Sequence, residues 1–468
     1  PYLDSHFWWM GNGKEPVNNW TVWCTQNVLL SVFLCKNVVP EIDECRRDMS
    51  ENAASLQSAV LCKACRSVDY FLAEYGEDGC CDEGAQYYRH AGLCLFNTME
   101  ILNAVTDGAF SELYKEPKIR NIASYIYNVH IDDKYYVNFA DCSPVAGRAG
   151  VREFLFALRT EHRNMAAFAA SDFLAGMPDT LLLSAENNLY YRLQNAFTIR
   201  EIENYAASSS DTASGRPDIY YPSVGIFLAK DDSLCLAVKA GDNGDSHNHN
   251  DTGSFTIYKK GKPLFIDVGV ESYTKKTFSP QRYEIWTMQS AYHNLPMING
   301  YMQRDGESYG ARNVSYQLHD DICYIDMDIA AAYPAEAGLI SWKRHAALVK
   351  GQEIVIRDDF SVRSDNAEKN RNAGNGTADN KNSVIMSLMT YEKPVIDKHT
   401  ADRAAFAEPD EFLTFQIGTA GTLRVKGGIL SRIETIPITD ARLQTAWEHE
   451  LYRILLNVTG TELEMHIS

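Results

Sequence analysis

The spacing of apolar residues changes near residue 205, and this change constrains the fold more than any other feature of the chain. Before it, apolar residues recur every three or four positions, which is the period of amphipathic helices. Short polar or Gly/Pro breaks separate the periodic segments, as in helical hairpins packed side by side. The pattern predicts five helical segments: 20–35, 41–75, 85–105, 117–130 and 151–174.

After the change, the chain is a succession of short runs rich in β-branched and aromatic residues. Hairpin-like turns such as Lys260-Gly261 and Lys350-Gly351, with no helical pattern between the runs, favour an antiparallel sandwich. The segment 364–382 is rich in Asn, Lys, Gly and Asp, which predicts a mobile loop between strands. The predicted strands are 224–228, 234–238, 254–258, 264–268, 314–318, 322–329, 340–349, 354–356, 384–388, 413–417, 451–456 and 463–467.

Length and composition favour two domains. A chain of 468 residues, 45% hydrophobic and 23% charged, can bury a large core and is too long for one ordinary domain. The small polar residues from Ala206 to Pro217 are typical of a linker. We therefore expect a helical domain at 1–205, a linker at 206–218 and an antiparallel β-sandwich domain at 219–468.

Net charge and cysteine content limit the kinds of binding partner and the cellular compartment that we expect. The net charge of -18 argues against nucleic acid, because phosphate binding needs a basic surface. Eleven cysteines in so long a chain indicate mostly reduced thiols and a reducing compartment, and Cys62 and Cys65 are expected to be ordinary buried helix residues. No run of 18 apolar residues predicts a membrane span, and the start at Pro1 suggests that the true N-terminus is missing.

The stretch 247–251, His-Asn-His-Asn-Asp, is the first candidate site. If it is a strand, the two-residue period places His247 and His249 on one face. With Asp267, at the end of an apolar run, and His293, they offer an ordinary zinc ligand set of histidines and a carboxylate. The alternatives are a carboxylate that caps a turn, and a cupin, although the glutamate that a cupin would supply is absent.

Residues 78–90 form a second candidate, because charged residues, two tyrosines and a histidine gather at the start of a predicted helix. Asp82 or Glu83 could instead serve the helix N-terminus, and the tyrosines could be core. Asn18 and Asn19 open another helix, where Asn is a common cap. Four tryptophans in the first 23 residues suit either a sugar-stacking wall or a hydrophobic core: Trp8, Trp9, Trp20 and Trp23.

Together these motifs resemble the heparinase II/III family of polysaccharide lyases. The β half carries His-x-His-Asn-Asp-x-Gly-Ser-Phe, then Tyr258-x-x-Gly261-Lys-Pro-Leu-x-x-Asp267-x-Gly269, Tyr273 and Ser-Ala-Tyr-His293-Asn. The helical half carries Asn-Asn-Trp at 18–20 and Asp-Gly-x-x-x-Glu-Gly-x-x-Tyr-Tyr at 78–88, similar to the family's helical toroid. The resemblance spans about residues 16 to 320.

The resemblance implies an incomplete (α/α) toroid of helical hairpins followed by a large antiparallel β-sandwich. It also implies β-elimination of a uronic-acid-containing polysaccharide or oligosaccharide, which needs a neutralised carboxylate, a base and an acid. The implied catalytic residues are Asn19, Tyr87 or Tyr88, His247 and Tyr273, with Tyr283 as a second candidate for the last position. The implied substrate-binding residues are Asn18, Trp20, Glu83, Arg89, His90 and Arg282. A structural zinc would be held by His249, Asp267 and His293.

One departure from the family concerns Trp20, which stands where some relatives carry a histidine directly after the substrate-binding Asn. A toroid histidine role would then fall on His90. Two other functions stay open: a glycoside hydrolase, which needs a carboxylate pair from Asp78, Asp82 and Glu83, and a non-catalytic protein that binds acidic glycans. The family resemblance suggests the bacterial periplasm or secretion, whereas cysteine usage suggests cytoplasm; the oligomeric state and the choice among heparan-type glycans, alginate and other uronates stay open.

Overall fold

The computed structural model describes residues 2–34, 46–177, 188–208, 215–363, 382–397, 412–419 and 421–468. The described chain forms two compact units, one helical and one of β-sheet. The helical unit comprises Pro1–Cys81, Ala85–Asn128 and Gly147–Gly215; the sheet unit comprises Asp82–Gly84, Val129–Ala146 and Arg216–Ser468. All but the last residue of the predicted loop 364–382, and residues 209–214 of the predicted linker, lie outside the described residues.

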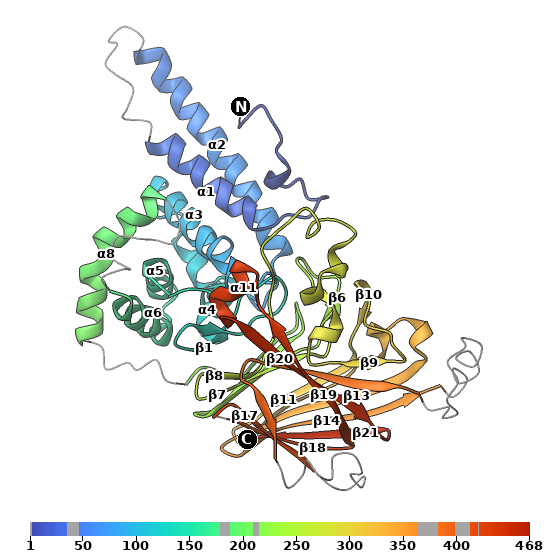
Figure 1. The fold of residues 1–468 in the computed structure, drawn as a ribbon. Coiled ribbons are helices and arrows are strands. Elements are labelled where there is room, and N and C mark those ends of the chain that lie inside the picture. Colours follow the sequence, from blue (N-terminus) through green and yellow to red (C-terminus); the bar gives the residue numbers. More distant parts are fainter. Residues whose placement is uncertain are drawn as a thin grey trace. The chain divides into compact units, whose positions relative to one another are not determined.

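The helical unit is built from pairs of neighbouring helices. In Figure 1, α1 and α2 run side by side, and α5, α6 and α8 pack as a group. Pro117 opens α4, where its missing N–H is not needed, and Ile119, Ile122 and Ile126 form the buried face. The helices are α1 (Asn19–Leu34), α2 (Arg46–Glu74), α3 (Gly92–Val105), α4 (Pro117–Val129), α5 (Val151–Arg159), α6 (Arg163–Ala175) and α8 (Leu189–Ser208), with the short 3₁₀ helices η1 (Trp8–Met10), η3 (Tyr87–Arg89) and η4 (Ser111–Lys115).

The predicted helices at 20–35 and 117–130 are confirmed by α1 and α4. The single helix predicted at 151–174 is wrong, because the chain breaks between α5 and α6. Glu161 has a φ of 59°, outside the right-handed helical region, and the His162 side chain caps α6 by accepting the backbone N–H of Met165 at 3.1 Å. Cys62 and Cys65 lie on α2 as free thiols, but the expectation that they are buried is wrong, because Cys62 is exposed and Cys65 is half-buried.

The sheet unit is a sandwich of two large antiparallel sheets. One has the order β11 (Arg312–Leu318), β12 (Ile322–Asp328), β13 (Leu339–Val349), β14 (Glu353–Val362), β21 (Glu462–Ile467), β18 (Gly421–Lys426), β17 (Leu413–Ile417) and β16 (Pro394–Ile396). The other has the order β19 (Gly428–Pro437), β20 (Glu450–Val458), β15 (Val384–Thr390), β8 (Lys262–Phe265), β7 (Phe255–Lys259), β5 (Leu234–Lys239), β4 (Ile226–Lys230) and β3 (Ile219–Tyr221), with β9 (Pro296–Ile298) beside β15.

Shorter elements complete this unit. Two small antiparallel pairs join β1 (His130–Asp132) to β2 (Tyr135–Tyr136), and β6 (Asp242–Asn243) to β10 (Gly306–Gly310). The 3₁₀ helices are η5 (Arg282–Glu284), η6 (Trp286–Met288), η7 (Ser290–Tyr292), η8 (Ala330–Ala332) and η9 (Ala335–Ala337).

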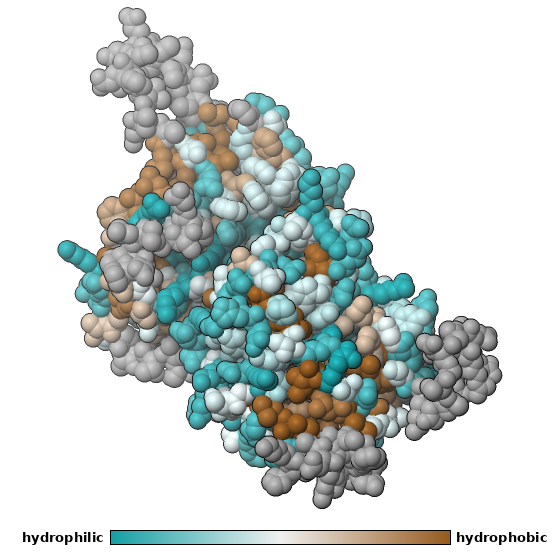
Figure 2. All heavy atoms as spheres, in the orientation of Figure 1, coloured by the Kyte–Doolittle hydropathy of each residue, from teal (hydrophilic) through white to brown (hydrophobic). Residues whose placement is uncertain are grey.

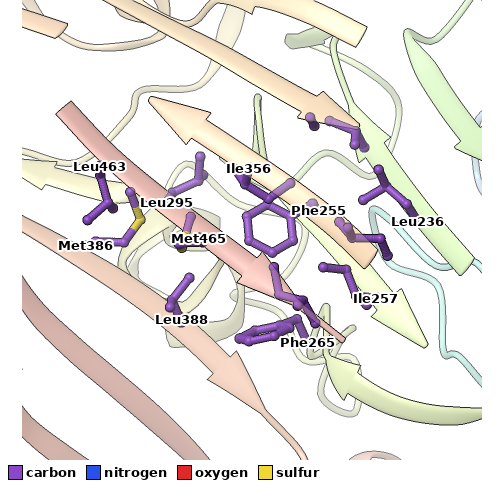
Figure 3. Close-up of a cluster of buried hydrophobic side chains, with 14 of the residues drawn as sticks. Leu236, Phe255, Ile257, Phe265, Leu295, Ile356, Met386, Leu388, Leu463 and Met465 are labelled. Carbon is purple, nitrogen blue, oxygen red and sulfur yellow. The ribbon is translucent and has the colours of Figure 1, made fainter. Parts of the chain in front are cut away.

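Alternating side chains fill the space between the two sheets. Along β12, Cys323, Ile325 and Met327 are buried while the residues between them are partly exposed, as expected for a two-residue period. Figure 3 shows Phe255 of one sheet close to Ile356 of the other within this apolar cluster. The strands predicted at 234–238, 314–318 and 413–417 are confirmed by β5, β11 and β17.

The expectation of no helix in this half is wrong, because α11 (Ala441–Trp447) lies between β19 and β20. Asp440 caps it by accepting the backbone N–H groups of Arg442 and Leu443 at 3.0 and 3.1 Å. Trp447 is fully buried in a second apolar cluster. With only seven residues, this helix carries too few repeats for its period to be recognised.

Apolar residues also reach the surface of the helical unit. On the face drawn in Figure 2, brown residues gather over the C-terminal part of α1 and along α8, where Leu34, Leu189 and Phe197 are exposed. Among the helices that the structure describes, none is long and apolar enough to cross a membrane.

Candidate active site and metal triad

The strand considered for 247–251 does not form: these residues make a loop between β6 and β7, and His247 has a φ of 56°. Asn243 explains why no ladder forms there, since its side-chain oxygen accepts the backbone N–H groups of Asp251 and Thr252 at 3.2 and 3.3 Å. The buried Lys239 fixes the same loop, with its Nζ 2.9 Å from Asp251 Oδ1. Burial alone would lower the pKa of Lys239, but Asp251 and Asp245 raise it.

His249, Asp267 and His293 meet at one buried point, as predicted for a metal site. Their ligand atoms all lie within 4.8 Å of one another, and all three side chains are fully buried. His249 Nε2 lies 3.1 Å from Asp141, His293 Nε2 lies 3.2 Å from the Thr287 carbonyl, and Asp267 Oδ1 accepts the Gly269 N–H. Inside the triad, His293 Nδ1 lies 3.1 Å from Asp267 Oδ2, while His249 Nδ1 has no hydrogen-bond partner among the described residues.

Such an arrangement fits a metal ion. Outer-shell acceptors commonly hold the far nitrogen of a ligating histidine, and thereby fix its tautomer. Two imidazole nitrogens and one carboxylate oxygen, aimed at a common point, form a donor set that divalent transition metals accept. The residues present therefore fit the predicted cofactor.

Asp141 links this triad to His247. Its fully buried carboxylate lies 2.9 Å from His247 Nδ1 and 3.1 Å from His249 Nε2, and accepts from Arg282 Nη2 at 2.6 Å. Burial would raise the pKa of Asp141, but the hydrogen bonds with His247, His249 and Arg282 hold it well below its usual range. Asp141 is therefore a carboxylate anion that binds three donors.

Glu83 lies on the other side of His247. Its Oε2 is 3.7 Å from His247 Nε2, and its side chain is nearly fully buried. Burial raises the pKa of Glu83 to about 7, although His247 lowers it. The turn that carries Glu83 packs tightly, since a Cβ on Gly84, whose φ is +83°, would come within 2.7 Å of Cys142.

Tyr273 lies against the His247 imidazole and keeps 36% of its surface exposed. Its hydroxyl is 3.5 Å from His247 Nδ1, and the two rings stack with centroids 6.2 Å apart. The Arg442 guanidinium sits 4.7 Å from the centre of the Tyr273 ring. The Asp440 carboxylate accepts the preceding backbone N–H, that of Ser272, at 3.1 Å. Helix α11 thus places two charged residues around Tyr273.

Arg282 and Tyr283 support the same loop. Besides Asp141, Arg282 donates to the Asn248 carbonyl at 3.0 and 3.1 Å and to the Thr277 carbonyl at 3.2 Å. Burial raises the pKa of Tyr283, against a hydrogen bond with Asn248 that lowers it. Of the two tyrosines considered from the sequence, Tyr273 is the one beside His247.

The helical unit holds the other predicted residues. Asn19 is buried at the start of α1, and the Asn18 side chain accepts the Trp20 N–H at 3.1 Å. Ring contacts connect Trp20 to Trp23 (5.3 Å), Trp23 to His90 (4.4 Å) and His90 to Tyr87 (6.4 Å). The structure therefore brings Trp20, His90 and Tyr87 into one aromatic cluster.

Tyr88 and Arg89 are engaged inside the helical unit. Tyr88 is fully buried and donates its hydroxyl to the Ala123 carbonyl at 3.0 Å. Arg89 donates to the Arg148 carbonyl at 2.9 Å and lies against Gly147, where a Cβ would come within 2.6 Å of the guanidinium.

Three residues of the site were not found from the sequence: Lys239, Asp141 and Arg442. Lys239 directly follows the predicted strand 234–238, Asp141 lies in a stretch with no clear pattern, and Arg442 is far along the chain from Tyr273. The sequence offered one signal: a charged residue at the end of an apolar run and close to a candidate motif. It applies only to Lys239, eight residues before His247.

Comparisons with known proteins agree with this architecture. A family described as "Heparinase II/III-like, C-terminal" matches residues 213–454. A search of curated proteins found no match.

Solved structures similar to this chain include heparan sulfate lyase HepC from Pedobacter heparinus, with a TM-score of 0.58 at 12% identity over 100% of this chain and 61% of that one. A heparinase III gene product has a TM-score of 0.57 at 15% identity, covering 95% and 59% of the two chains. A further structure of heparinase III has a TM-score of 0.52 at 13% identity, covering 94% and 60%. This chain thus spans about three fifths of their length.

These likenesses show the fold. The predicted incomplete (α/α) toroid of helical hairpins followed by a large antiparallel β-sandwich is confirmed.

Proposed function

Because the chain belongs to the heparinase II/III-like family, we propose that it is a polysaccharide lyase that cleaves uronic-acid-containing glycans by β-elimination. The observation that carries the proposal is the partly exposed Tyr273 hydroxyl beside His247, backed by Asp141 and Glu83. Lyase chemistry removes the proton next to a uronate carboxylate, so it needs a base, an acid for the leaving oxygen and groups that neutralise the enolate charge.

In this proposal Tyr273 takes the proton. A tyrosine base needs a lowered proton affinity, and the Arg442 guanidinium against its ring is a nearby source of positive charge. Arg282 does not supply this charge, since it is occupied by Asp141. Burial raises the pKa of the alternative Tyr283, which favours Tyr273.

His247 and Asn19 are assigned to the substrate carboxylate, and Tyr87 to the leaving oxygen. Of the two adjacent tyrosines, Tyr88 has its hydroxyl bound to Ala123 in the core, which supports Tyr87. The substrate-binding assignments remain Asn18, Trp20, Arg89 and His90. Glu83 and Arg282 are assigned to holding His247 and its loop, because both are mostly buried among protein partners.

We propose that the metal of the triad is zinc, with a structural function. Two histidines and a carboxylate suit zinc, and the buried position keeps the ion away from substrate. Bound there, zinc would stabilise the loop that carries His249 and, two residues earlier, His247.

The substrate is proposed to be an acidic polysaccharide or oligosaccharide. The similar structure from Pedobacter heparinus is titled a heparan sulfate lyase, which supports a glycosaminoglycan. A net charge of -18 favours a polymer with carboxylates over a heavily sulfated one.

Tyr273→Phe tests the assignment of the base. We expect it to lower kcat on uronate polymers roughly a hundredfold or more, because a positioned acid/base group contributes about that factor. The matched control is Tyr316→Phe, another exposed tyrosine of the sheet unit, on β11, which should keep full activity. Full activity of Tyr273→Phe would refute the role of Tyr273.

A further inference from the structure

One buried carboxylate serves two histidines with different tasks. Asp141 Oδ2 faces His247, while Oδ1 faces His249 and Arg282. Neither carboxylate oxygen is exposed, and His249 is fully buried as well. Each of the two histidines therefore has its orientation determined by a partner that solvent cannot replace.

The backbone around Asp141 is anchored to the metal triad. Asn138 Nδ2, three residues earlier, donates to the Asp267 and Cys142 carbonyls at 3.2 Å each. Arg442 Nη2 donates to the Asp141 carbonyl at 3.1 Å. The segment Val129–Ala146, which lies between helices in the sequence, is thus part of the sheet unit and carries this carboxylate into the site.

The two bonds impose opposite tautomers. A carboxylate anion accepts only, so a proton must lie on His249 Nε2 and on His247 Nδ1. His249 then presents a bare Nδ1 to the triad, and His247 presents Nε2 toward Glu83. The Asp141 carboxylate therefore determines the tautomer of both His249, the expected metal ligand, and His247, the imidazole beside Tyr273.

We propose that Asp141 is the positioning residue that fixes the tautomer and ring orientation of both His249 and His247, so that metal retention and turnover depend on one carboxylate. The part that concerns turnover rests on the proposed lyase function, whereas the part that concerns the metal does not. Asp141 acts through the two histidines and touches no substrate.

Two substitutions separate the two tasks. Asp141→Asn keeps one oxygen, which Arg282 draws toward itself and His249, and turns the amide N–H₂ toward His247 Nδ1. Zinc affinity should then stay close to that of the wild type, while kcat at saturating zinc falls roughly a hundredfold with little change in KM, as for a misplaced catalytic group. Asp141→Ala removes both acceptors, so zinc affinity should also fall roughly 10- to 100-fold.

The measurements are the zinc dissociation constant by chelator competition, kcat and KM on a uronate polymer, and histidine tautomers by ¹⁵N NMR. The matched control is Asp326→Asn, which removes a carboxylate from His345 Nδ1 (2.7 Å) on β12 and β13. It should change the zinc dissociation constant, kcat, KM and the tautomers of His247 and His249 in no way, although the tautomer of His345 itself can change. If Asp141→Ala fails to fold because Arg282 loses its anion, the isosteric Asn variant still gives the tautomer and kcat results.

Wild-type zinc affinity in Asp141→Ala, or unchanged His247 tautomer and kcat in Asp141→Asn, would overturn the proposal. A wild type that is inactive on every uronate polymer would contradict the lyase assignment alone. The zinc and NMR readouts would then still decide the role of Asp141.

Discussion

Glu83 and His247 form a pair whose charge state depends on burial. Glu83 Oε2 is 3.7 Å from His247 Nε2, and burial raises the pKa of Glu83 from 4.5 to about 7. In the unfolded chain the carboxyl loses its proton near its ordinary value, so between pH 4.5 and 7 the folded state binds more protons. The stabilising contribution of Glu83 is therefore complete below pH 4.5 and is lost as the pH rises through 7.

Glu83→Gln should remove this pH dependence. We expect the variant to match the wild type in unfolding free energy at pH 4.5 and to exceed it by on the order of 3 kcal/mol at pH 8, because the Gln side chain is never charged. Urea unfolding at the two pH values measures the difference. Glu284→Gln, at an exposed carboxylate paired with Lys276, is the control and should show almost no change.

At the scale of residues, the sequence was enough to predict which side chains form the metal triad, but not which residues hold them in place. His249, Asp267 and His293 were predicted as a set, and they converge. The resemblance to the heparinase II/III family carried this information, because spacing alone left His247 among the candidate ligands. Asp141 and Arg442 could not be found, since nothing local to either residue indicates which histidine or tyrosine it will meet.

At the scale of elements, α11 supports the loop that carries Tyr273. Asp440 caps the helix and also accepts the Ser272 N–H, so one carboxylate joins the two segments. Arg442, in the first turn of the same helix, lies over the Tyr273 ring. The position of Tyr273, the proposed base, therefore depends on a helix that lies far from it in the sequence.

Asp440→Ala should lower both stability and turnover. Loss of the cap costs about 1 kcal/mol, and the freed Ser272 loop should let Tyr273 move, which lowers kcat more than it changes KM. The control is His162→Ala, which removes the cap of α6 in the helical unit and should reduce stability without a change in kcat. Equal kcat for Asp440→Ala and the wild type would show that α11 does not position Tyr273.

Element predictions failed where side chains replace regular backbone bonds. A strand was considered for the histidine loop, yet side chains hold the loop instead: Asn243 accepts the Asp251 N–H, and Lys239 pairs with the Asp251 carboxylate. The helix at 151–174 was expected to be continuous because its apolar period continues across the break at Glu161. In both cases a side-chain hydrogen bond or ion pair determines the backbone conformation, and the spacing of apolar residues contains no information about such bonds.

At the scale of the whole molecule, each unit has its own apolar core. The change of periodicity near residue 205 was enough to predict helices before it and an antiparallel sandwich after it. The order of strands was not predictable, because β14 pairs with β21 across about a hundred residues of sequence. The residues 82–84 and 129–146 likewise belong to the sheet unit although helices flank them in the sequence.

The metal should stabilise one unit selectively. An ion that binds only the folded triad adds about 2.7 kcal/mol at a free concentration 100 times its dissociation constant. We expect zinc to raise the calorimetric transition of the sheet unit and to leave that of the helical unit unchanged. His249→Ala should abolish the shift; a shift that survives in this variant would place the metal elsewhere.

The most direct test of β-elimination compares two products of one reaction. The protein is incubated with a panel of uronate polymers and oligosaccharides, and new reducing ends and ultraviolet absorbance of an unsaturated uronate are measured together. A lyase creates one double bond for each bond that it cleaves, so the two signals should rise in equal amounts and both should disappear with Tyr273→Phe. New reducing ends without the absorbance would identify a hydrolase and contradict the account.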